Sequence, residues 1–465
     1  MKQATLFIVH FLFFFCSSMR AYSNLPQAMK DLEKKGILVS IEARDLDSGK
    51  ILYAVNENLT LNPASNVKLF TSAAALEILG SQFIFQTKVF HYGSIQDQKL
   101  KGNLYVQGFG DPLFVSERLW FLINDLAREG FKTITGDLIL DPSYFDTNQD
   151  IEFATGDDNQ RAYSAPLSAL SLNFNVVAIY VRPGHPNKKP LVFLDPENEY
   201  VEVLNEATTG AKDTLQVDRF QKKDKMVLKV SGVFPKNVHE KRIYRNVLDP
   251  VQYYGAVFKE FLKQRGIILK GDVKMGKVPD SAHSLTTYDS KFLKEILSGL
   301  NLYSNNFIAE QIVKTLGAFK KQAPGTTSKG IDVIKLFLEE NLKFKNGSFV
   351  IKNGSGFSKL NRFSSHHFVE LLHYSYKKFE IAPEFISSLG VPHEDSTLAR
   401  YQSLGKQYYL RAKTGSLTGV VALSGYLKSR HKKNIAFSIL LNSSSNNNDI
   451  LFTNIQKVLS YLSQI

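Results

Sequence analysis

The chain has 465 residues, of which 43% are hydrophobic and 22% are charged, and this is the composition of an ordinary globular protein rather than of a fibrous or disordered one. Its length exceeds that of a single ordinary domain, so we expect two or three units with ample core. The formal net charge is +13, which favours an anionic partner.

The first 23 residues have the layout of a secretory signal peptide. Lys2 precedes the apolar run LFIVHFLFFFC, and the small-residue pattern AYS follows it. The apolar run is too short to span a bilayer, so we expect export with cleavage after Ser23. The phenylalanines before Cys16 do not suit a lipoprotein signal. Cleavage removes Lys2, Arg20 and no acidic residue, so the net charge falls from +13 to +11.

Cleavage also removes the only cysteine, so the mature protein can form no disulfide and use no cysteine nucleophile. We expect a periplasmic protein, with the cell-wall face of a single-membrane cell as the alternative, and no nucleic-acid partner. An anionic wall polymer or a membrane surface suits the positive charge, although a merely solvated surface explains it equally well. No second run of about 18 apolar residues follows the signal, so we expect no other membrane segment.

The N-terminal half of the chain predicts a hairpin, a helix and a β-rich insertion. Residues 37–58 alternate apolar and polar side chains around a turn, which predicts a β-hairpin. Apolar residues at helical spacing predict a helix from Ser65 to Leu79, just after Pro63. Between residues 86 and 284, strand-like runs alternate with Gly, Pro and Asp turns. These runs are 103–112, 136–142, 177–184 and 226–235.

The C-terminal part returns to longer elements. A helix is expected near residues 290–301, and a strand pair over 419–429 and 434–442. Residues 449–465 form an amphipathic pattern with too little charge to favour membrane binding over core packing.

The first candidate motif is Ser65-Asn66-Val67-Lys68. Ser65 and Lys68 would share one helix face, a turn apart. A serine nucleophile needs a base, and a lysine can be that base if burial or a nearby cation lowers its pKa from about 10.4 towards neutrality. Taken alone, the motif is better explained as a helix start with a solvated lysine.

The second candidate motif is Ser304-Asn305-Asn306, at the start of another expected helix. Ser and Asn are ordinary helix caps, which explains the motif without any chemistry. The functional alternative makes Ser304 a proton shuttle and Asn306 an amide that orients a substrate.

The third candidate motif is Lys413-Thr414-Gly415-Ser416, at the edge of the C-terminal strand pair. A lysine and hydroxyl groups beside a glycine that allows close backbone approach suit a ligand carboxylate. A strand end with a solvated lysine explains the motif equally well.

The three motifs in this order resemble the signature of penicillin-binding proteins and serine β-lactamases. The long insertion before Ser304 resembles that of the low-molecular-mass class C penicillin-binding proteins, the D-alanyl-D-alanine carboxypeptidase/endopeptidases of the penicillin-binding protein 4 type. Segments similar to this family cover nearly the whole mature chain: GNLYVQGFGDP (102–112), GDLILDPSYFD (136–146), YSAPLSALSLNFN (163–175), NGSGFSKLNRFS (353–364) and AKTGSLTGVVALSGY (412–426). Asn353, Phe357 and Ser396 replace the family's usual Asp, Leu and Gly, and none of them is a reacting group.

The resemblance implies an α/β (α+β) fold with a serine β-lactamase/transpeptidase-like catalytic domain. This domain would be split over residues 24–85 and 285–465, and the inserted β-rich region over 86–284 would form one or two subdomains. The implied enzyme is a hydrolase of peptidoglycan stem peptides and cross-links, with β-lactam antibiotics as covalent inhibitors and with no cofactor or metal.

The resemblance also implies roles for single residues. Ser65 would attack the carbonyl between two D-alanines and form an acyl-enzyme, and Lys68 would take its proton, kept partly neutral by surroundings that include Lys413. Ser304, helped by Lys413, would protonate the leaving amine, and Asn306 would hold the substrate's amide carbonyl. The substrate-binding residues would be Thr414, Gly415 and Ser416: Thr414 and Ser416 for the terminal carboxylate, with the N–H groups of Ser65 and Ser416 as oxyanion hole.

Two other functions stay open. A β-lactamase of the same fold needs a deacylating base, and the nearby Glu310 is more simply a helix residue. A non-catalytic wall-binding homologue would not need all five polar residues of the motifs, which are Ser65, Lys68, Ser304, Asn306 and Lys413. The pair His366-His367 is more simply a helix start than a metal site. The sequence leaves open the carboxypeptidase–endopeptidase balance, the preferred diamino acid, the oligomeric state and the role of the insertion, for which a cleft-shaping loop near Tyr163 is one hypothesis.

Overall fold

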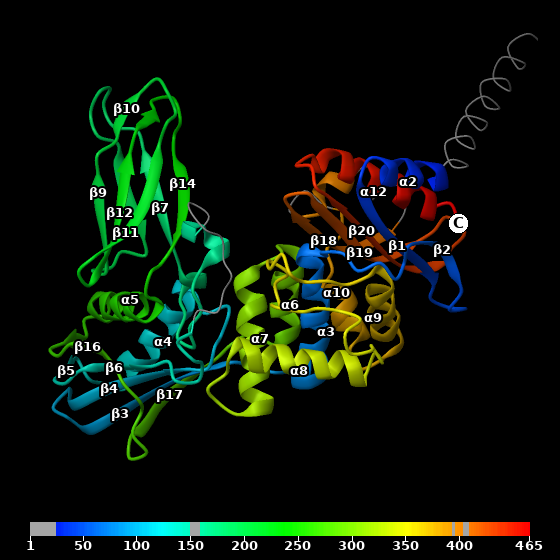
Figure 1. Ribbon diagram of the computed structural model, residues 1–465. Coiled ribbons are helices and arrows are strands. Elements are labelled where there is room, and N and C mark those ends of the chain that lie inside the picture. Colours follow the sequence, from blue (N-terminus) through cyan, green and yellow to red (C-terminus); the bar gives the residue numbers. More distant parts are fainter. Residues whose placement is uncertain (1–24, 149–158, 393–395, 403–408) are drawn as a thin grey trace, which may run out of the picture. The chain divides into compact units, whose positions relative to one another are not determined.

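Figure 1 shows the computed structural model, which describes residues 25–148, 159–392, 396–402 and 409–465. The predicted signal peptide lies outside these residues. The chain forms two compact units: unit 1 comprises Met1–Glu77, Leu297–Ser304 and Ile334–Ile465, and unit 2 comprises Ile78–Ile296 and Asn305–Val333. The predicted extents of the split catalytic domain and of the insertion stay predictions. In the described part of the chain, no helix is both long and apolar enough to cross a membrane.

Unit 1 is built on an antiparallel sheet with the order β18-β19-β20-β1-β2 (Figure 1). Its strands are β1 (Ile37–Asp45), β2 (Ile51–Val55), β18 (Tyr409–Leu417), β19 (Val420–Lys428) and β20 (Asn434–Ser443). Its helices are α2 (Leu25–Lys34), α3 (Lys68–Leu79), α9 (Ser365–Lys377), α10 (Ala382–Ser388) and α12 (Asn448–Leu462), with 3-10 turns η1 (Ala64–Val67) and η5 (Ala399–Tyr401). Helices α3, α6 (Leu293–Leu302) and α8 (Thr327–Glu340) each cross a boundary between the units. The predicted hairpin, C-terminal strand pair and final helix are confirmed.

One face of this sheet is apolar and packs against α2 and α12. Val39 and Ile41 of β1 share a buried cluster with Phe437 of β20 and with Leu451 and Ile455 of α12. Side chains alternate across a strand, so Ile37, Val39, Ile41 and Ala43 of β1 reach this face together, whereas Leu38 is exposed. The final helix therefore packs in the core, as expected, although one of its apolar residues, Ile450, is 43% exposed.

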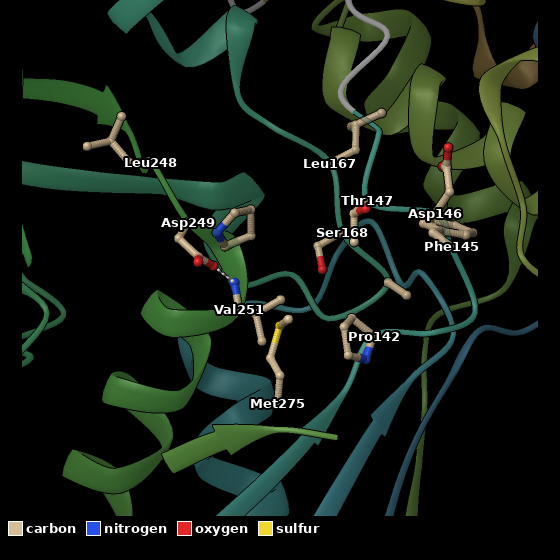
Figure 2. Close-up of a pocket in the computed structure, with 12 residues that line it drawn as sticks. Pro142, Phe145, Asp146, Thr147, Leu167, Ser168, Leu248, Asp249, Val251 and Met275 are labelled. Atoms are coloured by element: carbon tan, nitrogen blue, oxygen red, sulfur yellow. Dashed lines mark hydrogen bonds between the residues drawn. The ribbon is translucent and has the colours of Figure 1, made fainter. Parts of the chain in front are cut away.

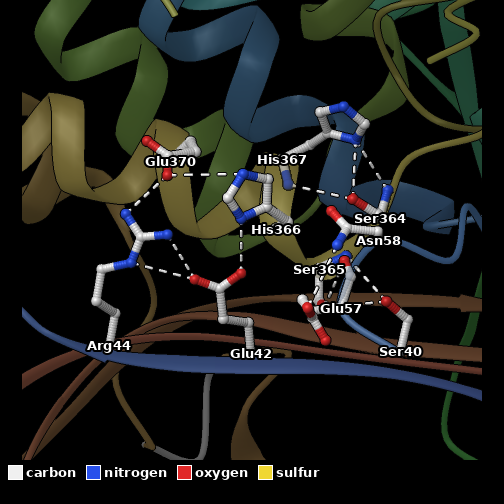
Figure 3. A network of polar contacts seen from close by, with 10 residues as sticks. All are labelled: Ser40, Glu42, Arg44, Glu57, Asn58, Ser364, Ser365, His366, His367 and Glu370. Atoms are coloured by element: carbon white, nitrogen blue, oxygen red, sulfur yellow. Dashed lines mark hydrogen bonds and ion pairs between the residues drawn. The ribbon is translucent and has the colours of Figure 1, made fainter. Parts of the chain in front are cut away.

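The opposite face of the sheet is polar, and it is buried as well. On β1 it carries Ser40, Glu42 and Arg44, and α9 packs over it. The fully buried Glu42 carboxylate pairs with Arg44 at 2.6 Å and with His366 of α9 at 2.8 Å, as Figure 3 shows. Arg44 also pairs with Glu370 at 2.7 Å. Helices on both faces thus bury a strand whose polar residues alternate like those of a half-exposed one.

The predicted insertion, residues 86–284, falls inside the bounds of unit 2. Its largest sheet has the path β15-β5-β4-β3-β17, with β6 paired to β4 and β16 to β6, and two smaller sheets have the orders β14-β7-β8 and β11-β12-β9. The strands are β3 (Gln86–Gln96), β4 (Lys99–Gly108), β5 (Thr133–Ile134), β6 (Leu138–Asp141), β7 (Val176–Arg182), β8 (Leu191–Asp195), β9 (Val201–Asn205), β10 (Thr208–Gly210), β11 (Gln216–Lys222), β12 (Lys225–Ser231), β13 (Val233–Pro235), β14 (Lys241–Asn246), β15 (Ile268–Leu269), β16 (Val273–Met275) and β17 (His283–Asp289).

The helices of unit 2 are α4 (Ser116–Arg128), α5 (Pro250–Gln264) and α7 (Asn306–Lys321), with 3-10 turns η3 (Ala162–Ser164) and η4 (Asn173–Asn175). The four strand-like runs of the sequence are confirmed, but α4 and α5 were not predicted. Both helices contribute to the core of unit 2, for example through Leu122 and Tyr254. The start of α5 has a recognisable signal, because Asp249 caps the helix and Pro250 follows it.

Figure 2 shows a cavity of about 230 Å³ in unit 2. Its two carboxylates already have partners. Asp249 accepts hydrogen bonds from the N–H groups of Val251 and Gln252, and Asp146 pairs with the buried Lys314 at 2.7 Å. We therefore assign no chemistry to this cavity.

Candidate active site

Ser65 lies in the 3-10 turn η1, directly before α3. The predicted helix therefore begins as a tighter turn, and Lys68 is its first α-helical residue. The Lys68 Nζ donates hydrogen bonds to the Ser65 Oγ at 3.0 Å and to the Ser355 carbonyl at 2.5 Å. Lys68 is 0% exposed, so the interpretation of a solvated lysine is wrong. A buried amine that touches the serine hydroxyl is placed to act as its base.

Helix α3 is held as a rigid wall behind Ser65. All its residues from Lys68 to Leu76 are buried, and Phe70 stacks on Phe363 with ring centroids 4.4 Å apart. The Thr71 hydroxyl donates to the Gly354 carbonyl at 2.8 Å. Packing and hydrogen bonding thus fix the end of the helix that carries Lys68.

Ser304 and Lys413 form the second hydroxyl–amine pair of unit 1. The Lys413 Nζ donates to the Ser304 Oγ at 2.8 Å and to the Thr414 carbonyl at 2.7 Å, and Lys413 is 0% exposed. Asn305, and not Ser304, caps α7, by accepting from the Ile308 N–H. Ser304 itself has a φ of 57°, a strained value for a residue with a side chain. The solvated interpretation of Lys413 is therefore also wrong.

The two lysines influence each other electrostatically. Burial, followed by the positive charge of Lys68, lowers the pKa of the Lys413 ammonium well below its usual value. Like charges in a desolvated site disfavour full protonation of both groups. The sequence predicted that Lys413 lowers the pKa of Lys68, whereas the structure shows a lowered pKa at Lys413.

Two glycines allow the backbone around Ser65 to be approached closely. A Cβ on Gly415 would lie 2.6 Å from the Pro63 carbonyl oxygen, and one on Gly356 would lie 1.9 Å from the Ala64 carbonyl oxygen. The position that a Cβ of Gly415 would occupy faces the backbone before the nucleophile, and the part of Gly415 in substrate binding stays a prediction. Ala64 has a φ of 46°, so the turn is itself strained.

Strand β18 is an edge of the sheet of unit 1, and it carries Lys413, Thr414, Gly415 and Ser416 in its interior rather than at its end. Alternation places the side chains of Thr414 and Ser416 on the face opposite that of Lys413. The Ser416 hydroxyl accepts a hydrogen bond from Asn448 Nδ2 at 3.4 Å, and the same amide donates to the Leu417 carbonyl. Asn448, at the start of α12, thus supports this end of the strand.

Asn306 belongs to unit 2, because the unit boundary falls between Ser304 and Asn305. It begins α7, and its Nδ2 donates to the carbonyl of Tyr163 at 3.4 Å. Phe307 packs with Ala165 and Leu167. The segment after Tyr163 is therefore anchored to the helix that begins with Asn306. Glu310 is a buried residue of α7, in agreement with its interpretation as a helix residue.

Sequence reasoning missed several residues that surround these groups. Ser355 and Gly356 contact Lys68 and the backbone before Ser65, and they lie in the segment NGSGFS, which was noted only as a similarity. Asn66 and Asn448 were given no role. His366 and His367 begin α9, as expected, and His367 caps it together with Ser364. In the described ranges, no three His, Cys, Asp or Glu side chains gather into a group that could hold a metal ion.

Comparison with known proteins gives the family. The model of the D-Ala-D-Ala carboxypeptidase 3 (S13) family matches residues 21–460. A D-alanyl-D-alanine carboxypeptidase of Actinomadura sp. (strain R39) is 32% identical over 446 residues, which are 91% of this chain and 81% of the relative. The D-alanyl-D-alanine carboxypeptidase DacB of Haemophilus influenzae is 26% identical over 447 residues, covering 92% of this chain and 90% of the relative.

A solved structure supports the fold. The crystal structure of penicillin binding protein 4 from Haemophilus influenzae has a TM-score of 0.79 at 23% identity and covers 94% of this chain and 99% of its own. A structure of the same protein complexed with a β-lactam has a TM-score of 0.77, with the same identity and the same coverage of both chains.

The chain has the fold of a penicillin-binding protein, and within unit 1 it brings Lys68 to Ser65 and Lys413 to Ser304. The chain belongs to the D-Ala-D-Ala carboxypeptidase 3 (S13) family. The predicted family, the mixed α/β fold and the predicted enzyme class, a serine D-Ala-D-Ala carboxypeptidase that acts on peptidoglycan, are thereby confirmed.

Proposed function

We propose that the enzyme cleaves D-alanyl-D-alanine ends and peptide cross-links of peptidoglycan through an acyl-enzyme on Ser65. The Ser65 Oγ attacks the carbonyl carbon while its proton passes to the Lys68 Nζ. The C–N bond then breaks, and the leaving amine receives a proton from the Ser304 hydroxyl, which Lys413 restores. Water then attacks the ester: its OH stays on the acyl carbon and its proton goes to the Ser65 oxygen, while Lys68 gives up the proton that it took and Lys413 regains the one that it lost.

The remaining motif residues bind the substrate in this proposal. The N–H groups of Ser65 and Ser416 stabilise the oxyanion, and Thr414 and Ser416 bind the terminal carboxylate beside Gly415. Asn306 binds the amide carbonyl of the substrate. Its link to the Tyr163 carbonyl supports a role of that segment in substrate choice.

The observation that carries the proposal is that two serine hydroxyls of unit 1 are each bonded to a buried lysine. Lys68 lies 3.0 Å from the Ser65 Oγ, and Lys413 lies 2.8 Å from the Ser304 Oγ. Both lysine side chains are 0% exposed, and a buried amine that donates to a serine hydroxyl is placed for proton transfer.

We further propose that the enzyme works outside the cytoplasm, in the periplasm, and that β-lactams inhibit it by acylating Ser65. The chain's positive charge supports association with an anionic wall or membrane surface. Co-sedimentation with isolated wall material would test this association. Binding that falls steeply with added salt is expected, and no binding at low salt would contradict it.

Release of D-alanine from a stem pentapeptide tests the proposed function. Wild-type enzyme should release D-alanine, and Ser65→Ala should release none while melting at a similar temperature. Ser375→Ala is the matched control, because Ser375 is a fully buried serine of unit 1 outside the motifs, and it should keep the activity. No release by wild type would favour a non-catalytic wall-binding protein, and rapid turnover of penicillin would favour a β-lactamase.

A further inference from the structure

We infer that Asn66 is a positioning residue that fixes the Ser65 turn to the strand pair carrying Lys413. This inference rests on the proposed function, since it concerns the same reacting serine. Asn66 directly follows Ser65 in η1 and is 0% exposed. Its amide is therefore committed to the interior of unit 1.

The side chain of Asn66 begins a short chain of buried hydrogen bonds. Its Nδ2 donates to the Ser424 Oγ at 2.7 Å, and the Ser424 Oγ lies 2.8 Å from the Ser438 Oγ. Both serines are 0% exposed. Hydrogen bonds between buried side chains are strengthened by the low local dielectric, so this chain restrains the Asn66 side chain.

The strand register shows what this chain is attached to. Ser424 of β19 is the cross-strand partner of Lys413 in β18, and Ser438 of β20 pairs with Ser424 on one side and with Glu42 of β1 on the other. Opposite residues of neighbouring strands have Cβ atoms about 5 Å apart and face the same way. Asn66 thus binds next to Lys413, on the polar face of the sheet.

The turn is strained and held by several local bonds. It is a single 3-10 turn that begins at Ala64, with its φ of 46°; the Ala64 N–H donates to the Asn62 Oδ1 at 2.8 Å, and the Asn66 N–H bonds to the Pro63 carbonyl at 3.2 Å. Such a conformation persists only where its surroundings hold it. The bond from Asn66 to Ser424 supplies a fixed point directly beside the nucleophile.

Packing alone does not account for an amide at this position. The Oδ1 of Asn66 is buried and has no hydrogen-bond partner within the described residues. A buried unmet acceptor is unfavourable, and an apolar residue of similar size would avoid it. The hydrogen bond from the Asn66 Nδ2 to the Ser424 hydroxyl explains why an amide is present here.

Acylation by a fluorescent penicillin tests this role. Asn66→Ala and Ser424→Ala should each slow acylation of Ser65 on the order of tenfold or more, because small displacements of a nucleophile are costly. The double variant should be no slower than Asn66→Ala, since both changes break the same link. The matched controls are Asn454→Ala in α12 and Ser375→Ala in α9, which remove a buried amide and a buried hydroxyl elsewhere in unit 1. Both should react like wild type.

The pH profile separates positioning from mere stability. Asn66→Asp places a carboxylate beside the partner of Lys413, so the acylation profile should move to higher pH, as a nearby anion favours the charged lysine. Loss of stability alone would lower the amplitude without moving the profile.

Three results would overturn the inference. They are rates within about twofold of wild type for both single variants, additive losses in the double variant, or slowing only where the protein has unfolded. If Asn66→Ala does not fold, the acylation rate of Ser424→Ala, a variant that removes a single oxygen, tests the inference instead. Failure of wild type itself to be acylated would instead overturn the proposed function.

Discussion

At the scale of single residues, the buried amines of Lys68 and Lys413 dominate the chemistry of unit 1. Each touches one serine hydroxyl and one backbone carbonyl. Burial and the positive charge of Lys68 lower the pKa of the Lys413 ammonium, and an amine whose pKa lies nearer neutrality exchanges protons with a neighbouring hydroxyl more readily.

Removal of Lys68 tests its role as the base. Lys68→Ala should slow acylation by penicillin about 10²- to 10⁴-fold, the usual contribution of a positioned acid or base. Circular dichroism and thermal melting should still report a folded protein. Acylation at the wild-type rate would mean that another group takes the proton.

A pair of glycines tests the close approach behind Ser65. Gly356 and Gly347 both lie in unit 1 with φ near +80° and +83°, but a Cβ on Gly356 would meet the Ala64 oxygen, whereas one on Gly347 would meet nothing within 4 Å. Gly347→Ala should therefore cost only about 1 kcal/mol of unfolding free energy. Gly356→Ala should cost more and also slow acylation, as measured by denaturant unfolding and penicillin labelling. Equal effects of the two changes on acylation would contradict this account.

At the scale of elements, β1 and α9 are joined by the charged network of Figure 3. The hydrogen bond with Glu42 raises the pKa of His366. Burial opposes ionisation of Glu42, but its bonds to His366 and Arg44 outweigh burial and lower the pKa of the carboxyl. The stability that His366 contributes is fully present below its unfolded pKa of about 6.5 and is lost as the pH rises through its folded pKa. The stability that Glu42 contributes is lost as the pH falls through the lowered folded pKa of its carboxyl.

The neighbouring histidines of α9 should show opposite pH dependence. Burial lowers the pKa of His367 to about 4, so this residue weakens the fold as pH falls below about 6.5, by about 2 kcal/mol at pH 5. His366→Ala should therefore be more destabilising at pH 5.5 than at pH 8.5. His367→Ala should be less destabilising at pH 5.5 than at pH 8.5. Denaturant unfolding at the two pH values measures both. The same sign for the two variants would exclude this assignment.

The elements were largely predictable from the sequence, whereas the partners of the site residues were not. The hairpin, α6, α7, β19, β20 and α12 follow from local periodicity. Lys413 and Ser304 are 109 residues apart, and Asn66 and Ser424 are 358 apart, so no local pattern relates them. Ser424 and Ser438 are single serines within largely apolar strands, and nothing in the local pattern indicates which buried side chain they bond.

At the scale of the whole molecule, the two units have separate cores. The cluster of unit 2 includes residues from Val89 to Ile267, and that of unit 1 joins the sheet to α2 and α12. Substitutions in the core of unit 2 should therefore change stability without changing the chemistry of unit 1.

Asp111 should make the stability of unit 2 fall with rising pH. Burial raises the pKa of its carboxyl to about 7, and its Oδ2 has no hydrogen-bond partner in the described part of the chain. Since the unfolded carboxyl has a pKa of about 3.9, the folded state loses stability between about pH 4 and 7. Asp111→Asn should stabilise the protein at pH 8 by up to about 4 kcal/mol and have little effect at pH 4.

Asp137 is the control for this prediction. It also belongs to unit 2, but its hydrogen bond with Lys274 lowers the pKa of its carboxyl. Asp137→Asn should thus destabilise the protein at pH 8, the opposite sign. Penicillin acylation should be unchanged in both variants. A stability of Asp111→Asn that follows wild type from pH 4 to 8 would contradict the assignment.

The most direct test of the central claim is the intact mass of the mature protein after incubation with a penicillin, followed by peptide mapping. The account predicts one stable adduct, located on Ser65. No adduct with intact drug would contradict it in favour of a non-catalytic wall-binding protein, and no adduct with hydrolysed drug would contradict it in favour of a β-lactamase.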